Sequence, residues 1–191
     1  YGPPKREGVI NVQSSDREAE GSRFVGKICR GGHRLPVLNT QKAGLMALCT
    51  ALVTDQVSKT IVAMNADRLS DSLPVLPGFN LTFLRNDGVT FGLFGNMPWW
   101  ALSLIAFAVC GVLAVMLWRT TRYLEAVAYG LIIGGALGNI VDRLRFGGVT
   151  DFLDFYVGNT HWPAFNIADV AIVTGVAVLF VPERFSRPAQ T

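Results

Sequence analysis

The stretch WWALSLIAFAVCGVLAVMLW, from Trp99 to Trp118, carries no charged residue over its whole length. A helix needs roughly 20 apolar residues to cross the hydrocarbon core of a bilayer. This stretch therefore predicts a transmembrane helix, and the composition agrees with it. Half of the 191 residues are hydrophobic and only 16% are charged, against about 25% charged in a typical soluble domain. We expect an integral membrane protein.

Three further apolar stretches flank this one: Ala43–Met64, Leu124–Val141 and Phe165–Val181. Each falls in the range of about 17–25 residues that a spanning helix uses. The fold class that we expect is an all-α membrane protein with four transmembrane helices. The organisation that follows has a membrane domain at 43–182 with outer loops at 65–98 and 142–164, flanked by cytoplasmic tails at 1–42 and 183–191.

The Lys and Arg residues outside the spans predict the orientation. Twelve of them lie in the N-terminal segment, the link between the second and third spans and the C-terminal tail, and four lie in the other two loops. Since cytoplasmic loops carry the excess of Lys and Arg, both termini should be cytoplasmic. Residues 1–42 are polar and basic without an apolar run, which predicts a disordered tail and not a signal peptide. The net charge of +3 is too small to indicate nucleic-acid binding.

The first outer loop has a strand-like pattern. Residues 79–94 alternate apolar and polar side chains on either side of Asn-Asp-Gly at 86–88. Alternation around such a turn is typical of two short β-strands. We expect a small extracytoplasmic β-structure lying on or over the membrane surface.

Ionisable residues inside a span are costly, so each needs an explanation. Asp55 and Lys59 are four residues apart and share a helix face, which favours an ion pair. This pair either neutralises itself to allow insertion, or leaves Lys59 to fix a polar group of a substrate or of the outer loop.

The third apolar stretch ends in a group of polar residues. Gly130, Gly134 and Gly138 recur every fourth residue, which predicts close helix packing. Asn139 and Asp142 then share a face at the outer end. A carboxylate near a helix C-terminus opposes the helix dipole, so Asp142 should pair with a cation such as the adjacent Arg143.

Acidic residues also lie at the start of the fourth stretch and in the loop before it. Asn166 is placed to cap a helix and Asp169 lies in its first turn. Capping explains Asn166 but leaves a buried Asp169 in need of a partner. In the loop, Asp151 and Asp154 would by default be solvated acids.

The sequence lacks the residues that several kinds of protease and metal site require. The histidines are His33 and His161, and neither G-x-S-x-G nor H-E-x-x-H occurs, so neither a serine triad nor a zinc protease is supported. Three isolated cysteines give no zinc pattern and no disulfide framework. We expect no metal site. Carboxylates gathered at the outer interface fit aspartic-protease chemistry, in which two close carboxyl groups share one proton. A neighbouring cation would keep both acids ionised, which favours Asp151 over Asp142 as the partner of Asp169.

The sequence resembles the bacterial lipoprotein signal peptidases (signal peptidase II) over Leu45–Phe180. The motifs that carry the resemblance are D-Q-V-S-K from Asp55, N-D-G-V-T-F-G from Asn86, G-G-A-L-G-N-I-V-D-R from Gly134, G-V-T-D-F from Gly148 and F-N-I-A-D from Phe165. Each motif is weak alone, but five in order are specific. Two departures are Thr90, where an Ala is more usual, and the long segment before the first span.

The resemblance implies an aspartic endopeptidase of the bacterial inner membrane with its active site at the outer face. It implies cleavage of diacylglyceryl-modified prolipoproteins before the lipid-modified cysteine, by Asp151 and Asp169. The positions that it gives supporting or substrate-binding roles are Asp55, Lys59, Asn86, Gly88, Asn139, Asp142, Arg143 and Asn166. Phe165 and Ala168 also match. The outer strands resemble the family's periplasmic cradle. We expect no cofactor, membrane lipids as the surroundings, and a monomer.

Two other classes of function compete with this one. A small transporter or proton channel could use Asp55, Lys59, Asp142 and Asp169 as a relay, but only the first two lie well inside a span. A non-catalytic scaffold could pack through the glycine repeat, and it would tolerate isosteric changes of Asp to Asn.

Overall fold

The computed structural model describes residues 1–2, 37–87 and 98–180. The chain divides into two units, 1–35 and 36–191. Of the first unit only Tyr1 and Gly2 are described, and both are exposed. The helices and strands below belong to the second unit. Two positions singled out in the sequence, Gly88 and Thr90, lie outside the described residues, as does most of segment 1–42.

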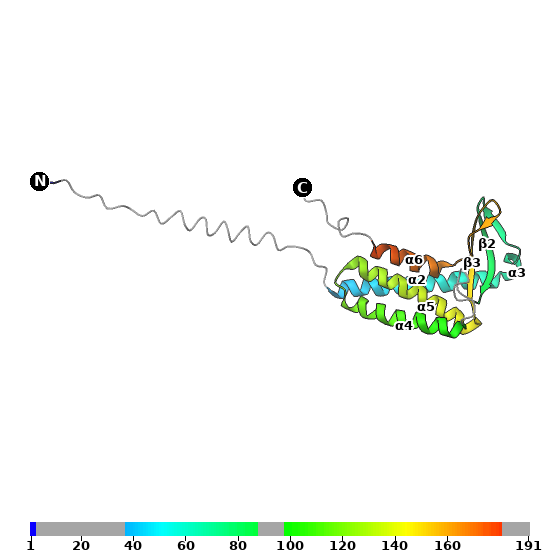
Figure 1. Ribbon diagram of the computed structural model, residues 1–191, viewed down its shortest axis with the longest axis horizontal. Coiled ribbons are helices and arrows are strands. Elements are labelled where there is room, and N and C mark those ends of the chain that lie inside the picture. The colour runs from blue at the N-terminus through cyan, green and yellow to red at the C-terminus, as the bar shows by residue number, and fades with distance from the viewer. Residues whose placement is uncertain (3–36, 88–97, 181–191) are drawn as a thin grey trace. The chain divides into compact units, whose positions relative to one another are not determined.

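A helix forms at each of the four apolar stretches (Figure 1). These helices are α2 (Val37–Met64), α4 (Trp99–Arg119), α5 (Tyr123–Phe146) and α6 (Ile167–Leu179), with a short helix α3 (Ala66–Leu69) after the first. In the described part of the chain, α2, α4 and α5 are long and apolar enough to cross a membrane, whereas α6 is an apolar helix of 13 residues. The protein is therefore a helical membrane protein.

The helix ends differ from the predicted ones. Helix α2 already begins at Val37, within the segment predicted as a tail. Helix α5 continues to Phe146 instead of ending near Val141, so Asp142 and Arg143 lie in its last turns and not in a loop. Gly147 ends this helix in the left-handed conformation, with φ of 75°, which a residue without a side chain adopts at little cost.

Helix α5 lies at the centre and packs against α2, α4 and α6. Of its apolar window 61% is buried, against 22% for α2 and 17% for α4. Close packing with α2 depends on glycine: a Cβ atom at Gly130 would strike the carbonyl of Gly44, and one at Gly134 would lie 2.9 Å from the Cβ atom of Ala51. The packing role predicted for the glycine repeat is confirmed.

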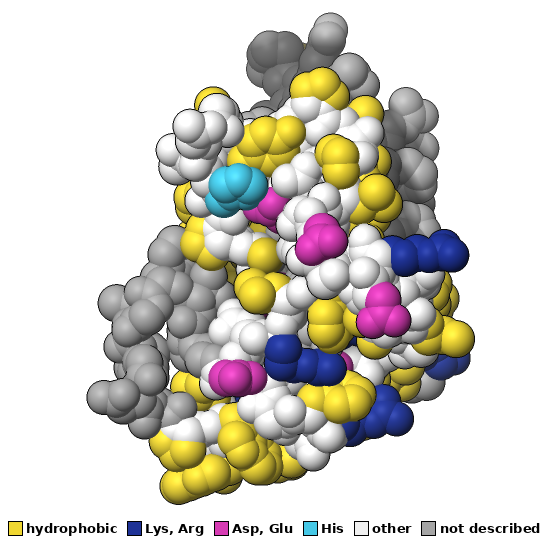
Figure 2. Space-filling model, turned by 90° about the vertical axis from the view of Figure 1, so that its right-hand side faces the viewer, with side chains coloured by type: hydrophobic (Ala, Val, Ile, Leu, Met, Phe, Trp, Pro, Cys, Tyr) yellow, Lys and Arg dark blue, Asp and Glu magenta, His cyan; other side chains and the backbone are white. Residues whose placement is uncertain are grey.

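A four-stranded antiparallel sheet lies at one end of the helices (Figure 1). Its order is β1 (Leu73–Leu76), β2 (Phe79–Asn86), β3 (Val149–Val157) and β4 (Thr160–His161). The predicted strand before Asn-Asp-Gly is present as β2, while the second predicted strand lies largely outside the described residues. Strand β3 was not predicted, because its segment was interpreted as a loop. Figure 2 shows this end of the molecule, where charged side chains of both signs lie among hydrophobic ones.

Two contacts attach the sheet to the helices. Phe152 of β3 packs with Val62 of α2 and Leu69 of α3 in one hydrophobic cluster. Leu153 pairs with Phe165 as an isolated antiparallel bridge, and the backbone N–H of Phe165 donates to the carbonyl of Leu153 at 3.1 Å. Since Phe165 lies two residues before α6, this bridge places the start of α6 beside β3.

The glycine packing can be tested with Gly134→Ala. We expect the free energy of unfolding to fall by about 1–3 kcal/mol, because the new methyl group must push α2 away from α5. Thermal unfolding in detergent, followed by circular dichroism, measures it. The control is Gly111→Ala on α4, where an added Cβ meets nothing within 4 Å. An equal effect of both changes would contradict the close approach of α2 and α5.

Candidate active site

Asp151 and Asp169, which the sequence analysis predicted to be partners, both accept a hydrogen bond from the same residue, Asn166. Asp151 lies on β3 and is 2% exposed, and Asp169 lies in the first turn of α6, partly buried. Asn166 lies between them: its Nδ2 donates to Asp151 Oδ1 at 2.6 Å, and its backbone N–H donates to Asp169 Oδ2 at 3.3 Å. One asparagine therefore holds both carboxyl groups.

The start of α6 explains how Asn166 is held. Its side-chain oxygen accepts from the backbone N–H of Asp169 at 3.1 Å, which with the reverse bond makes a capping box. The predicted cap at Asn166 is confirmed. The carboxyl group of Asp169 accepts a hydrogen bond of the capping box and also belongs to the candidate site. Helix capping therefore helps to fix the geometry of the site.

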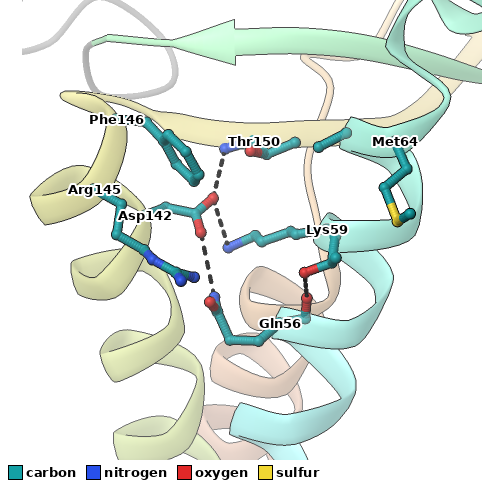
Figure 3. A pocket seen from close by; sticks show the side chains of 9 residues that line it. Gln56, Lys59, Met64, Asp142, Arg145, Phe146 and Thr150 are labelled. Carbon is teal, nitrogen blue, oxygen red and sulfur yellow. Dashed lines mark hydrogen bonds and ion pairs between the residues drawn. The ribbon is translucent and has the colours of Figure 1, made fainter.

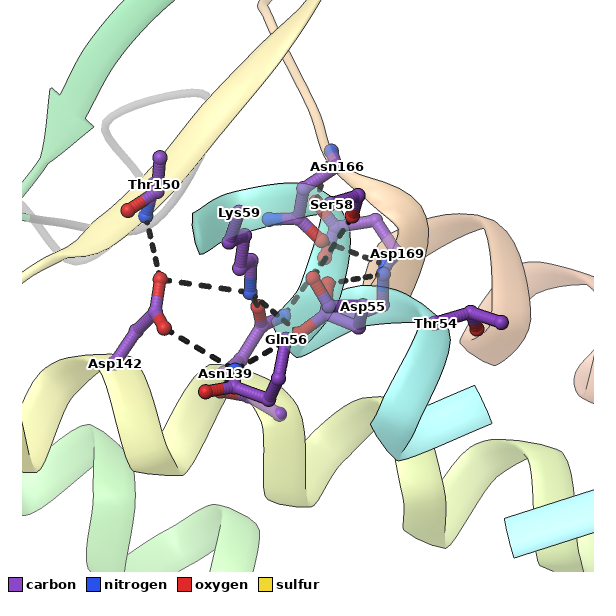
Figure 4. A network of polar contacts seen from close by, with 12 residues as sticks. Thr54, Asp55, Gln56, Ser58, Lys59, Asn139, Asp142, Thr150, Asn166 and Asp169 are labelled. Carbon is purple, nitrogen blue, oxygen red and sulfur yellow. Dashed lines mark hydrogen bonds and ion pairs between the residues drawn. The ribbon is translucent and has the colours of Figure 1, made fainter. Parts of the chain in front are cut away.

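Asn139 and Lys59 support Asp169 from the other side (Figure 4). Asn139 Nδ2 donates to Asp169 Oδ1 at 2.9 Å, and the Lys59 ammonium donates to Asn139 Oδ1 at 2.8 Å. Lys59 also pairs with Asp55 at 2.9 Å, as the spacing of four residues predicted. The Lys59 ammonium therefore contacts side chains of α2 and α5 inside the bundle, and not a group of an outer loop.

Asp142 joins this cluster by pairing with a cation, as predicted. Its Oδ2 atom lies 3.6 Å from the Lys59 ammonium and accepts from the backbone N–H of Thr150 at 2.9 Å. Its Oδ1 atom accepts from Gln56 Nε2 at 3.2 Å. The cation that pairs with Asp142 is therefore Lys59 on the facing helix, and the adjacent Arg143 also interacts with Asp142 electrostatically.

Asp55 connects the cluster to α6. It is fully buried, and its Oδ1 atom accepts from the backbone N–H of Ala168 at 2.9 Å. A Cβ atom at Gly138 would strike Asp55 Oδ2, so this glycine makes room for the carboxylate. The first N–H groups of a helix have no acceptor within that helix. Asp55 supplies an acceptor for one of them at the start of α6.

Asn86 completes the contacts of Asp151 from the sheet. Its Nδ2 donates to Asp151 Oδ2 at 2.9 Å across the pairing of β2 with β3. All the predicted site residues that the structure describes are therefore brought to one region, with Gly88 outside the description. Sequence reasoning missed Gln56 and Thr150; the position of Gln56 inside D-Q-V-S-K, beside Asp55, was the available signal.

Two expectations about acidic residues are wrong. The site does not exclude cations: Arg143 interacts electrostatically with Asp169, Asp151 and Asp142, and Lys59 also acts on Asp151. Adjacency in the sequence was a poor guide here, because folding brings cations from two helices to both acids. Asp154 is not a solvated loop acid. It is 7% exposed, accepts from Asn80 at 3.0 Å and lies 2.8 Å from His161 Nδ1.

Burial raises the pKa of Asp151 from 3.8 to about 6. Hydrogen bonds from Asn86 and Asn166 lower the pKa, the nearby Asp169 raises it, and the Lys59 charge lowers it. Burial therefore outweighs two favourable hydrogen bonds. An acid that keeps its proton close to neutral pH, beside a second acid, is the arrangement that shared-proton chemistry requires.

A pocket of about 580 Å³ opens beside the cluster, between α2, α5 and the start of β3 (Figure 3). Lys59 and Asp142 form its polar side, and Met64 and Phe146 belong to its apolar lining. The lining includes Thr150, next to Asp151, but not Asp151 or Asp169 themselves. Across the described ranges, no group of three or more His, Cys, Asp or Glu is placed to hold a metal ion.

Comparison with known proteins identifies the class of this fold and site. The sequence pattern of the signal peptidase (SPase) II family matches residues 47–184. The lipoprotein signal peptidase of Photorhabdus laumondii is 40% identical over 161 residues, covering 82% of this chain and 96% of its own length. That of Yersinia pseudotuberculosis is 43% identical over 160 residues, covering 81% and 94%.

A solved structure shows the same fold. It is a bacterial membrane enzyme determined by the in meso method at 2.3 Å resolution, 28% identical, with a TM-score of 0.65 over 78% of this chain and 93% of its own. The protein is a membrane protease. The chain belongs to the signal peptidase II family, and with its apolar helices it fits a bacterial inner-membrane protein that takes part in lipoprotein processing.

The role of Asn166 in the site can be tested by stability. Asn166→Ala removes the helix cap and one buried hydrogen bond to a carboxyl group, so we expect at least about 1 kcal/mol of destabilisation. Thermal unfolding in detergent measures the change. Asn65→Ala is the matched control, because the side chain of Asn65 is exposed and donates to a backbone carbonyl of the preceding helical turn, not to a carboxyl group. A loss no larger than that of the control would contradict the bridging geometry.

The raised pKa of Asp151 predicts a pH-dependent stability. The folded protein binds this proton more tightly than the unfolded chain, so the contribution is present below about pH 4 and is lost as the pH rises through about 6. Asp151→Asn removes the buried charge, so the variant should be more stable than the parent at pH 8, by up to about 3 kcal/mol. The difference should disappear below about pH 4.

Thermal unfolding across this pH range measures the difference, with Asp71→Asn, an exposed acid at the same end, as the control. A variant that is less stable than the parent at every pH would show that the pKa of Asp151 is not raised.

Proposed function

We propose that this chain removes signal peptides from diacylglyceryl-modified prolipoproteins, with Asp151 and Asp169 as the catalytic pair. The observation that carries the proposal is Asn166, which bonds to both carboxyl groups. Two acids held on one residue can bind one water molecule between them. The names of the relatives support the substrate, since they are lipoprotein signal peptidases.

The reaction would follow aspartic-protease chemistry. One carboxylate takes a proton from the bound water as its oxygen attacks the carbonyl carbon before the lipid-modified cysteine. The other carboxyl group gives its proton to the carbonyl oxygen, which forms a tetrahedral diol. The first acid then protonates the leaving nitrogen, the second recovers a proton from the diol, and the C–N bond breaks. The pair returns to its starting state without a metal or cofactor.

The remaining predicted residues would support the pair or the substrate. Asp55, Lys59, Asn139 and Asp142 form the buried cluster behind Asp169 and β3, and Asn86 and Asn166 bind Asp151. Arg143 interacts electrostatically with both acids. In the described part of the chain no hydrogen bond joins Arg143 to a side chain, which leaves its guanidinium available to a substrate. Gly88 is included in this proposal only because its position matches a motif of the signal peptidase II family.

We place the site at the outer face of the bacterial inner membrane. In this arrangement the four helices cross the bilayer, both termini are cytoplasmic and the sheet is extracytoplasmic. The excess of Lys and Arg on the side of the termini supports this orientation. The sheet and both acids lie at the same end of the helices, where a lipid-anchored substrate would present its modified cysteine. The protein would act as a monomer surrounded by lipid.

Nothing in the described residues favours a proton channel. The polar cluster occupies the sheet end of the bundle. Toward the other end, Cys110, Leu117, Ala126, Tyr129 and Ile133 form a hydrophobic cluster. A relay through the bundle would have to cross this cluster, which offers no carboxylate to carry the proton.

The test is cleavage of a purified diacylglyceryl prolipoprotein in detergent or bilayers. Asp151→Asn and Asp169→Asn should each lower the rate at least about 100-fold, since each removes a proton acceptor or donor from the reaction. Asp71→Asn, an exposed acid at the sheet end, should cleave at the parental rate. The unmodified precursor should resist cleavage. Processing by both site variants at the parental rate would overturn the proposal.

A further inference from the structure

Two of the amide groups around the two acids, those of Asn139 and Asn166, have only one possible orientation. An ammonium group donates hydrogen bonds and cannot accept them. Because the Lys59 ammonium lies 2.8 Å from the side chain of Asn139, the facing atom must be the amide oxygen. The amide nitrogen then necessarily faces Asp169, where it donates to Oδ1 at 2.9 Å. Lys59 thereby turns Asn139 into an obligatory donor toward Asp169.

The same argument fixes Asn166. The backbone N–H of Asp169 can only donate, so the atom of Asn166 that it contacts at 3.1 Å must be the amide oxygen. The amide nitrogen of Asn166 therefore faces Asp151, and its backbone N–H donates to Asp169 Oδ2 at 3.3 Å. Both oxygens of Asp169 thus receive a hydrogen bond whose direction cannot be reversed. Bonds of this kind favour the ionised form of a carboxyl group. Asp151 also accepts two amide hydrogen bonds, from Asn166 and Asn86, so the features below distinguish the two acids.

Three further features favour the negative charge on Asp169. It lies in the first turn of α6, where the helix dipole stabilises an anion. Arg143 of α5 interacts more strongly with Asp169 than with Asp151. Asp169 is also partly exposed, whereas Asp151 is 2% exposed on β3, so ionising Asp151 costs more desolvation. Lys59 of α2, Arg143 of α5 and Asp169 of α6 are the charged groups that act on Asp151 from the surrounding helices.

We infer that Asp169 is the ionised base that takes the proton from water, that Asp151 is the acid that carries the shared proton, and that Lys59 sets this assignment through Asn139. The inference rests on the proposed function for its chemistry, but the position of the proton can be measured without a substrate. Lys59 and Asn139 are positioning residues here, because they act through Asp169.

The first measurement is infrared spectroscopy of the full chain in lipid nanodiscs, with ¹³C-labelled aspartate. At about pH 5, between the ordinary pKa of an aspartate and that of Asp151, the parent should show a protonated carboxyl group. Asp151→Asn should remove this signal. Asp169→Asn should keep it, although it should titrate at lower pH because a neighbouring negative charge is gone. A signal lost in Asp169→Asn and kept in Asp151→Asn would overturn the assignment.

The second measurement tests the positioning role with Asn139→Leu, which leaves Lys59 paired with Asp55 and Asp142. Without its donor, Asp169 should be a less well oriented base for the water molecule, so the chemical step should slow. We expect kcat to fall about 10-fold or more, with little change in KM. Asn65→Leu, the same change at an exposed site between α2 and α3, is the control.

The outcomes separate the two proposals. A kcat that stays at the parental value in a folded Asn139→Leu protein would overturn the role of Lys59 and Asn139. If the parent fails to cleave the prolipoprotein while the infrared signal follows Asp151, the proposed function fails and the location of the proton stands. If Asn139→Leu does not fold, Asn139→Ser provides the same test, since its shorter side chain removes the donor with less change in polarity.

Discussion

The ammonium group of Lys59, buried between the helices at the sheet end of the bundle, is the feature on which the rest of the site depends. The residue is 3% exposed and its charge meets Asp55, Asp142 and the amide oxygen of Asn139. A charge removed from water costs several kcal/mol unless its partners are close and well oriented. Helices α2 and α5 can meet this requirement only by approaching closely. The glycines of α5 permit the approach, since a side chain at Gly134 or Gly138 would strike α2.

Two carboxylates connect Lys59 to the elements that carry the proposed catalytic pair. Asp55 accepts the backbone N–H of Ala168 at the start of α6, and Asp142 accepts the backbone N–H of Thr150, next to Asp151 on β3. The positions of Asp169 and Asp151 are therefore both fixed from a single buried cluster. The bridge between Leu153 and Phe165 connects the same two segments directly. A site built in this way holds its two acids on rigid elements, which a reaction that depends on the geometry of one water molecule requires.

The burial of Asp151 lowers the stability of the folded chain near neutral pH, a cost that the proposed catalytic role would explain. A carboxyl group whose pKa rises to about 6 is partly ionised near neutral pH while buried, which an apolar side chain would avoid. Such groups are frequent at functional sites because catalysis needs an acid that still holds its proton there. The neighbouring Asp154 is also buried, but Asn80 and His161 satisfy it within the sheet, so it holds the strands together.

Hydropathy and local motifs were sufficient to predict the helices and the candidate residues. Long apolar stretches such as Trp99–Trp118 form helices wherever they occur, because no other backbone arrangement buries its polar groups in lipid. Capping at Asn166 and the pair of Asp55 with Lys59 depend on spacings of three and four residues, which can be read directly from the sequence. Strand β3 escaped prediction because its stability comes from pairing with β2, some 65 residues earlier along the chain.

The sequence by itself thus determined a helical membrane protein with a set of acidic and amide residues in five short motifs. Only the tertiary structure decided which of these residues touch: that Asp142 pairs with Lys59 on the facing helix, that cations from two helices reach both acids, and that Asn166 joins Asp151 to Asp169. The physical reason is that electrostatic and hydrogen-bond energies depend on distance and direction in space. In a folded chain both are set by how helices and strands pack, and not by adjacency along the backbone.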